Sequence, residues 1–209
     1  MAETTTTYPV RETYHHGDLR RTLITVATDA ITELGPTKTS LREAARRAGV
    51  SGPAALHHFK DKSALLAAVA ICGFEELISR RERLVEGQTS PEKRLRIYVE
   101  AYVGFAIEKP AIFNLMFGPL IAPRENYPDL KKAGLRSFRA LKTEVQAYLE
   151  HVGVEKDGNT ATWVVWSAAH GLSSLLVDFP SAQERPENLS DQVLLDAMME
   201  NLLAGLRRG

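Results

Sequence analysis

The chain has 209 residues, and its 26 Lys and Arg balance 26 Asp and Glu, so the formal net charge at pH 7 is zero. This length suits one or two domains with a buried core, and the neutral balance excludes any argument for nucleic-acid binding from overall charge. The single cysteine, Cys72, excludes an intrachain disulfide framework and is expected to be an inert core thiol of a cytoplasmic protein. No secretory signal is predicted at the N-terminus.

The first third of the sequence predicts a flexible tail followed by a three-helix unit. Residues 1–13 are rich in threonine and are expected to form the tail, and residues 14–62 are expected to form a helix-turn-helix domain. Its first helix has apolar residues at spacings of three and four from Leu19 to Leu34 and stops at Gly35-Pro36.

The helix-turn-helix motif itself is predicted over about residues 40–59. Ser40 and Glu43 have the spacing of a capping box, in which each side chain satisfies a backbone amide at a helix start. Gly49 can adopt the left-handed conformation that ends a helix. Ser51 can cap the next helix, whose first turn tolerates Pro53. Two short helices joined in this way can enter the major groove of DNA.

Residues 63–209 predict further helices and no strand, because valine and isoleucine recur at helical spacing. A long helix is expected over residues 61–87, and it becomes charged at residues 80–83. Residues 158–177 lack Asp, Glu, Lys and Arg but contain several polar residues, so a buried helix is expected rather than a membrane span. The chain is therefore predicted to be all-α, with about nine helices. The later helices are expected over residues 91–108, 111–117, 129–151, 158–179 and from residue 191 onward.

The motif resembles the N-terminal DNA-binding domain of the tetracycline-repressor (TetR) family of bacterial transcription regulators. That domain has a Thr-Ser-apolar-Arg-acidic opening, then Ala-Gly-Val-Ser, then a short helix ending in His-Phe, then a Lys at the start of the fourth helix. Residue types and spacing agree from Leu19 to Leu66. The matching residues are Thr39-Ser40-Leu41-Arg42-Glu43, Ala48-Gly49-Val50-Ser51, His58-Phe59 and Lys62.

The remainder resembles the regulatory domain of one branch of that family, a branch with a Trp-x-x-x-His-Gly motif. The resemblance implies that residues 63–209 form a helical ligand-binding and dimerisation domain. The residues that carry it are Phe105-Ala106 to Pro110, Met116-Phe117-Gly118 and Trp166 to His170-Gly171, together with the opening at residues 14–20.

The family's DNA contacts can be transferred to matching positions. Arg42 can pair with a guanine, although a solvated arginine paired with a nearby carboxylate is the alternative. His57 is the one polar side chain on the recognition helix that could read a base edge. The full expected DNA-binding set is Ser40, Arg42, Ser51, Gly52, Pro53, Ala54, His57, His58 and Lys62, of which Ser40, Ser51, His58 and Lys62 are expected on phosphates.

The recognition helix departs from the family pattern at two positions. Family members usually carry Leu-Tyr before the final x-His-Phe, and the tyrosine commonly contacts a phosphate. Here these positions are Ala55 and Leu56. The departure predicts weaker DNA binding rather than a different fold.

Aromatic residues on three helices predict an effector cavity, because the family packs these helices together. Their mostly apolar faces with a few polar tips suit an apolar or aromatic small molecule. His170 could orient the ligand or could be a satisfied core histidine, and many of the others could be core. The expected lining is Tyr98, Tyr102, Phe105, Phe113, Met116, Phe117, Trp163, Trp166 and His170.

The resulting hypothesis is a ligand-responsive repressor that binds a palindromic double-stranded DNA operator as a homodimer through its last two helices. One alternative is a helical small-molecule-binding or interaction protein with weakened DNA binding. An enzyme is a third, with His170 as its only candidate acid or base. No catalytic residue, cofactor or membrane partner is predicted. No metal site is predicted either, because His57 and His58 point about 100° apart on a helix and no cysteine or carboxylate cluster completes a ligand set.

Overall fold

A computed structural model describes residues 16–121, 123–178 and 189–208. The predicted N-terminal tail and the loop at residues 181–188 lie outside this part. Within it the chain is all-α, with nine α-helices, one short 3-10 helix and no strand, which confirms the predicted fold class. The elements are α1 (His16–Leu34), α2 (Leu41–Arg47), α3 (Gly52–His58), α4 (Lys62–Val85), α5 (Pro91–Glu108), α6 (Pro110–Phe117), η1 (Arg124–Asn126), α7 (Pro128–Val152), α8 (Gly158–Asp178) and α9 (Asp191–Arg207).

The helix starts follow local hydrogen-bonding chemistry. At α2 and α3, the hydroxyls of Ser40 and Ser51 accept hydrogen bonds from the amides of Glu43 and Ala54. The reciprocal half of the predicted capping box is replaced by ion pairs, because the Glu43 carboxylate accepts from Arg46 and Arg47. Asp61, Ser90 and Ser190 cap α4, α5 and α9 in the same way as the two serines.

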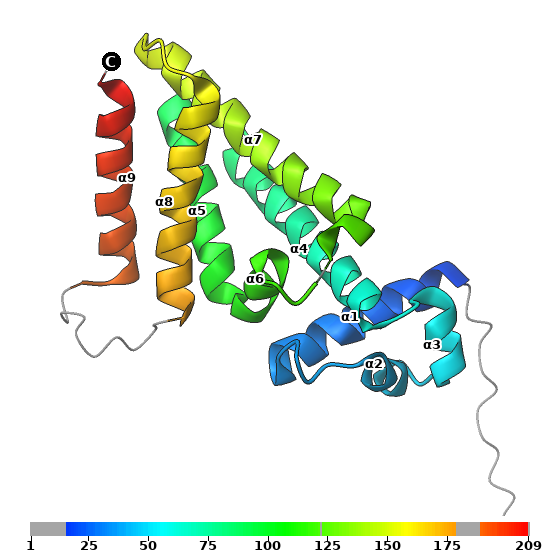
Figure 1. Cartoon of the computed structure of the whole chain (residues 1–209). Coiled ribbons are helices and arrows are strands. Elements are labelled where there is room, and N and C mark those ends of the chain that lie inside the picture. Colours follow the sequence, from blue (N-terminus) through cyan, green and yellow to red (C-terminus); the bar gives the residue numbers. More distant parts are fainter. Residues whose placement is uncertain (1–15, 122, 179–188, 209) are drawn as a thin grey trace, which may run out of the picture.

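Helices α1, α2 and α3 form a small unit at one end of the molecule, packed on the first turns of α4 (Figure 1). Gly49 has φ of 67°, the left-handed conformation predicted for the turn between α2 and α3. The apolar face is made of small residues in α2 and α3 and larger ones in α1 and α4. Its buried members include Leu23, Ile31, Ala44, Ala45, Ala55, Phe59, Leu65 and Leu66.

Helix α4 runs from this unit into the second group of helices, where α5, α6 and α7 pack against it (Figure 1). Helix α8 packs on α5 and α7, and α9 lies on the outer side of α8. Helix α6 approaches α4 closely at Gly73, where a Cβ atom would lie 2.7 Å from Met116 Sδ. Helix α6 also contacts α1, so it bridges the two groups of helices.

Two expectations about individual segments can be compared with this fold. Cys72 is exposed on α4 rather than buried, so the predicted core thiol is wrong. Its helix turns this position outward, while neighbouring Gly73 and Phe74 face the core. Among the residues that the structure describes, no helix is both long and apolar enough to cross a membrane.

Candidate functional site

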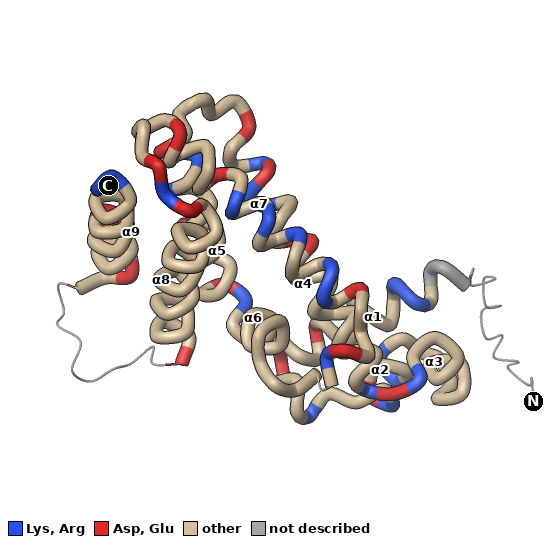
Figure 2. The backbone as a smooth tube through the Cα atoms, turned by 45° about the horizontal axis from the view of Figure 1, so that its top comes forward, with Lys and Arg blue, Asp and Glu red and all other residues tan. Residues whose placement is uncertain are grey.

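The outer surface of α3 is composed of small and imidazole side chains. Gly52, Pro53 and His57 are exposed, and Ala54 is partly exposed at the start of the helix. Figure 2 shows that α3 carries no Lys, Arg, Asp or Glu, whereas α1 and α2 do. Any lysine or arginine contact of this unit with a polyanion must therefore come from residues outside α3.

The two departures from the family pattern have different surroundings. Ala55 is fully buried and belongs to the hydrophobic core, so it is not available for a DNA contact. Leu56 is 54% exposed on the outer side of α3. An apolar side chain thus stands at a surface position where the family commonly has a tyrosine hydroxyl.

The three arginines of α2 differ in their partners. Arg46 Nη2 lies 2.7 Å from a Glu43 carboxylate oxygen, and Arg47 pairs with both Glu43 and Glu33. The hydrogen bonds from Arg46 and Arg47 lower the pKa of Glu43 to about 2. Arg42 is exposed and has no ion-pair partner among the described residues. It is the α2 cation that is available for an external anion or base.

The residues at the end of α3 and the start of α4 are already engaged. The Lys62 ammonium donates a hydrogen bond of 2.7 Å to the Thr37 carbonyl, which holds it against the turn before α2. The His57 and His58 rings meet edge to face, with centroids 5.6 Å apart. No group of three or more His, Cys, Asp or Glu in the described part of the chain is placed to hold a metal ion.

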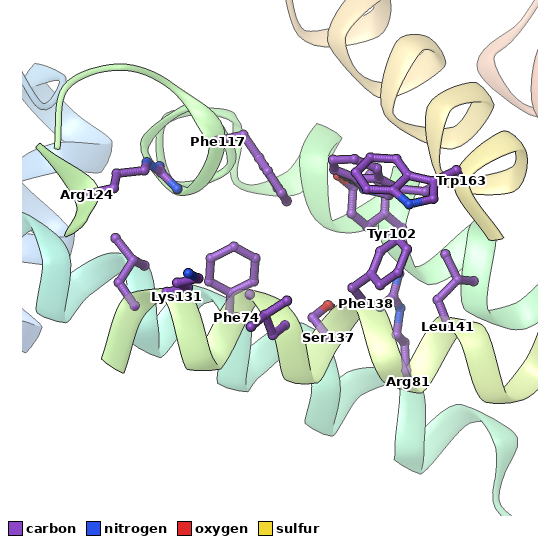
Figure 3. A pocket seen from close by; sticks show the side chains of 14 residues that line it. Phe74, Arg81, Tyr102, Phe117, Arg124, Lys131, Ser137, Phe138, Leu141 and Trp163 are labelled. Carbon is purple, nitrogen blue, oxygen red and sulfur yellow. Dashed lines mark hydrogen bonds between the residues drawn. The ribbon is translucent and has the colours of Figure 1, made fainter. Parts of the chain in front are cut away.

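A cavity of about 330 Å³ opens between α4, α7 and α8, with the end of α6 and η1 on its remaining side (Figure 3). Most of its wall is aromatic or aliphatic. Two arginines, one lysine, one serine and one tyrosine supply charged and hydroxyl groups, and no carboxylate is among the lining residues. Its lining residues are Phe74, Arg81, Tyr102, Phe117, Arg124, Leu130, Lys131, Gly134, Leu135, Ser137, Phe138, Leu141, Trp163 and Trp166.

The nine aromatic, methionine and histidine positions expected at a pocket fall into two sets. Tyr102, Phe117, Trp163 and Trp166 line the cavity, and Trp163 is 54% exposed. The other five lie outside the lining. They are Tyr98, Phe105, Phe113 and Met116, which are buried core residues, and the partly buried His170.

His170 is part of a hydrogen-bonded group behind this wall. Its Nδ1 lies 2.8 Å from the Tyr102 hydroxyl, and Trp166 Nε1 donates to the same hydroxyl at 3.4 Å. Burial raises the pKa of Tyr102 and lowers that of His170, which favours the neutral form of each. His170 can thus orient Tyr102 in the cavity wall, while Phe113 and Phe117 cover its ring.

Neither the α7 residues of the cavity wall nor Arg81 of α4 was predicted from the sequence to line a cavity. Leu135 and Phe138 are ordinary members of an amphipathic stripe and carry no separate signal. Arg81 lies within a charged run, Arg80-Arg81-Glu82-Arg83, that is typical of a solvated helix face. Arg81 lies at helical spacing from the buried Phe74, Leu77 and Ile78, and this spacing in the sequence indicates that Arg81 faces inward.

Arg81 is the one charged residue deep in the cavity wall, and only 2% of its surface is exposed. Its Nε donates to the Tyr98 carbonyl at 3.2 Å and its Nη1 to the Ser137 hydroxyl at 3.1 Å. The guanidinium carbon also lies 5.2 and 5.4 Å from the ring centres of Tyr98 and Tyr102. Burial lowers the pKa of Arg81 to about 10, so the group is still charged at pH 7.

The outer faces of α8 and α9 form a third exposed feature. Val164 and Leu175 on α8 and Val193 on α9 are each about half exposed. At Gly171 a Cβ atom would meet no other atom within 4 Å, so this part of α8 faces open space. These two helices therefore leave apolar and small residues uncovered in the single chain.

A helix-turn-helix unit joined by a long helix to a helical domain with a cavity defines the class of helix-turn-helix transcription regulators. The description "Bacterial regulatory proteins, tetR family" matches residues 23–69, and "Tetracyclin repressor-like, C-terminal domain" matches residues 95–202. The chain belongs to the TetR family and is a DNA-binding transcription regulator.

Solved structures agree with this assignment of the fold. A protein of unknown function from Rhodococcus sp. RHA1 is 28% identical, with 95% of this chain and all of that chain covered and a TM-score of 0.78. A TetR/AcrR-family regulator from Thermobifida fusca YX-ER1 is 23% identical over 91% of this chain and all of its own, with a TM-score of 0.68. FadR from Bacillus subtilis, in complex with stearoyl-CoA, is 14% identical over 90% of this chain and 98% of its own, with a TM-score of 0.66.

Proposed function

We propose that this regulator is a cytoplasmic, ligand-controlled repressor that binds a palindromic operator as a homodimer. The observation that carries the proposal is the position of α4. Its first turns supply Leu65 and Leu66 to the core of the helix-turn-helix unit, and its later turns supply Phe74 and Arg81 to the cavity wall. A ligand that changes the wall therefore acts on the helix that supports the reading head.

Control requires that the ligand bind two arrangements of α4 with different affinity. The contact of α4 with α6 at Gly73 is tight, and α6 also contacts α1. A shift of Phe117, which lines the cavity from the end of α6, can thus reach the helix-turn-helix unit by a second route. These packed contacts support a rigid-body movement of the reading head rather than local unfolding.

For the DNA complex, we infer that Arg42 reads a base and that phosphates meet Ser40, Ser51, His58 and Lys62. Gly52, Pro53, Ala54 and His57 face the groove. The free charge of Arg42 supports this role, because its two neighbouring arginines are held by carboxylates. Lys62 would have to release or share the Thr37 carbonyl to contact a phosphate.

The DNA contacts are tested with an operator selected from a random DNA pool. Arg42→Ala should weaken binding about tenfold or more and relax sequence preference at one position. Lys62→Ala should weaken all sequences alike and reduce the slope of log K against log salt by about one. Fluorescence anisotropy over a salt series measures both. Binding that is unchanged in both variants would show that the assignment of contacts is wrong.

For the dimer, we infer that α8 and α9 of two subunits form a four-helix bundle. The exposed Val164, Leu175 and Val193 support this face. Val164→Glu should yield monomers and lose operator binding, since one reading head has only half of the contacts. Leu84→Glu, at an equally exposed leucine on α4, is the matched control. Analytical ultracentrifugation decides, and a Val164→Glu protein that remains dimeric refutes the proposed face.

The effector proposal retains the expected cavity residues in two roles. Tyr102, Phe117, Trp163 and Trp166 contact the ligand, and His170 positions Tyr102. The buried Tyr98, Phe105, Phe113 and Met116 support them from behind. We also assign the chain to the branch with the Trp-x-x-x-His-Gly motif, because Trp166 and His170 both bond Tyr102 and so tie this motif to the cavity.

A second candidate function is a helical small-molecule-binding protein with weak operator affinity. The exposed Leu56 favours it, because an aliphatic side chain cannot donate a hydrogen bond to a phosphate. Leu56→Tyr distinguishes the two. If the wild type already shifts its operator at physiological salt, the repressor proposal stands. If only Leu56→Tyr does so, the second candidate is favoured.

A further inference from the structure

The guanidinium of Arg81 is buried without a counter-ion in the described part of the chain. Its two hydrogen-bond partners are a carbonyl and a hydroxyl, and its other close contacts are the rings of the uncharged Tyr98 and Tyr102. Buried charges are normally paired, because removing an ion from water costs several kcal/mol. Because the Arg81 guanidinium keeps its charge without a carboxylate partner, it can still bind an anion.

Several N–H donors of Arg81 have no partner in the described part of the chain. An arginine has five N–H donors, and Arg81 uses two of them, from Nε and Nη1. Nη2 donates to no described residue. Every enclosed side-chain nitrogen or oxygen in that part of the chain has a partner, so Nη2 must border open space. Arg81 is among the residues that line the cavity, and we therefore place Nη2 at the cavity.

The rest of the wall suits a molecule with one anionic end and an apolar body. Phe138, Leu141 and Trp163 lie around Arg81 in Figure 3, and they offer apolar surface next to the spare donors. The other cations of the lining, Lys131 and Arg124, come from the start of α7 and from η1. Arg124 donates to the carbonyls of Met116 and Gly118 and so caps the end of α6.

We propose that the effector is an apolar carboxylate whose carboxyl group binds the spare N–H donors of Arg81. The inference rests on the proposed ligand-controlled function. The planar guanidinium matches a carboxylate with two parallel hydrogen bonds. A dianionic phosphate is the weaker fit, because Arg81 is a single charge and Arg124 already donates to the end of α6. Ser137 is a positioning residue, since its hydroxyl holds Nη1 in place.

The binding test uses straight-chain decanoate, its uncharged counterpart decanamide, and decyl phosphate. The chain has two tryptophans, Trp163 and Trp166, and both line the cavity, so their fluorescence reports occupancy directly. The wild type should bind decanoate about tenfold or more tightly than decanamide, the difference expected for a charge-assisted hydrogen bond. Equal affinities, tighter binding of decyl phosphate, or binding of neither probe would each overturn the proposal.

The variants test whether Arg81 is the cause of this preference. Arg81→Met should bind decanoate no more tightly than decanamide, while Arg83→Met, at the exposed arginine two residues along α4, should keep the preference for decanoate. Arg81→Lys retains the charge without the fork and should keep part of the preference. Ser137→Ala should weaken decanoate only. A preference that survives in Arg81→Met refutes the assignment, and if that variant does not fold, Arg81→Lys and Ser137→Ala decide.

Release of the selected operator is measured separately, so that the two proposals can fail independently. If decanoate binds through Arg81 but never changes operator affinity, the ligand-controlled function is wrong and the carboxylate site stands. If neutral molecules occupy the cavity and release the operator while carboxylates have no advantage, the function stands and the carboxylate assignment is wrong.

Discussion

Helix α7 receives two arginine side chains on its buried side and presents a different group to each. Arg94 from α5 meets the carboxylate of Glu144, with two hydrogen bonds of 2.8 and 2.6 Å. Arg81 from α4 meets the hydroxyl of Ser137, seven residues or about two turns earlier. The Glu144 hydrogen bonds raise the pKa of Arg94, whereas burial lowers that of Arg81. The charge of Arg94 is thus neutralised by Glu144 within the protein. The charge of Arg81 is not neutralised by Ser137 and remains available to an external anion.

The largest expected effect comes from breaking the complete pair. Arg94→Met leaves the Glu144 carboxylate, whose side chain is 4% exposed, without its cation. Loss of one partner of a buried pair is strongly destabilising, so the free energy of unfolding should fall by about 3 kcal/mol. Urea denaturation measures it. The double variant Arg94→Met with Glu144→Leu is the control and should recover most of the loss.

The difference between the two arginines can be removed by giving Arg81 a carboxylate partner, as Arg94 already has. Ser137→Asp places a carboxylate beside the spare charge, and it should raise the free energy of unfolding by about 1 kcal/mol. It should also weaken decanoate, since the new side chain competes for the same donors. Ser137→Asn has the same size without the charge and is the matched control. Thermal unfolding with and without decanoate gives both quantities, and equal behaviour of the two variants contradicts the interpretation.

Substitution by methionine should lower the free energy of unfolding at Arg94 but should not lower it at Arg81. Arg81→Met removes a buried charge without orphaning a carboxylate, so stability should be unchanged or higher by up to about 1 kcal/mol. A rise of this size corresponds to roughly 2–4 °C in the melting temperature for a chain of this length. A loss as large as that of Arg94→Met would mean that Arg81 is needed for folding rather than kept for a ligand.

The smallest effect concerns His170, which touches the cavity group through Tyr102. Burial lowers its pKa below the ordinary value of 6.5, so the folded state binds fewer protons than the unfolded chain. Its contribution to stability is complete above pH 6.5 and is lost as the pH falls toward the lowered pKa. The groups that pack on its ring are Tyr102, Phe113, Phe117 and Trp166, and none is charged at these pH values.

Chemical denaturation between pH 7 and pH 5 should show this loss in the wild type and a flatter profile in His170→Asn. The carboxylates with strongly lowered pKa values, Glu43 and Asp157, titrate from their ordinary values toward about 2. Their effect therefore lies at lower pH and does not overlap with that of His170. Identical slopes in the two proteins would exclude His170 as the titrating group.

The helix-turn-helix unit could be predicted almost residue by residue, because its signals are local. Ser40, Ser51 and Gly49 act on amides within a few residues of themselves, and the structure has each in the predicted role. The cavity could be predicted only in part. Tyr102, Phe117 and Trp166 are recognisable as aromatic residues on helix faces, whereas the α7 wall has the same pattern as any amphipathic helix.

The sequence by itself determined that the chain is helical, where most helices begin and end, and which family its first third resembles. These properties depend on periodicity, capping and turn chemistry, which act over a few residues. Only the tertiary structure decided that Cys72 is exposed, that Arg46 and Arg47 are paired while Arg42 is not, and that Arg81 is buried. Within one charged run, whether an arginine meets water, a carboxylate or a cavity depends on the helix packed opposite. Here α7 turns Ser137 rather than Glu144 toward Arg81.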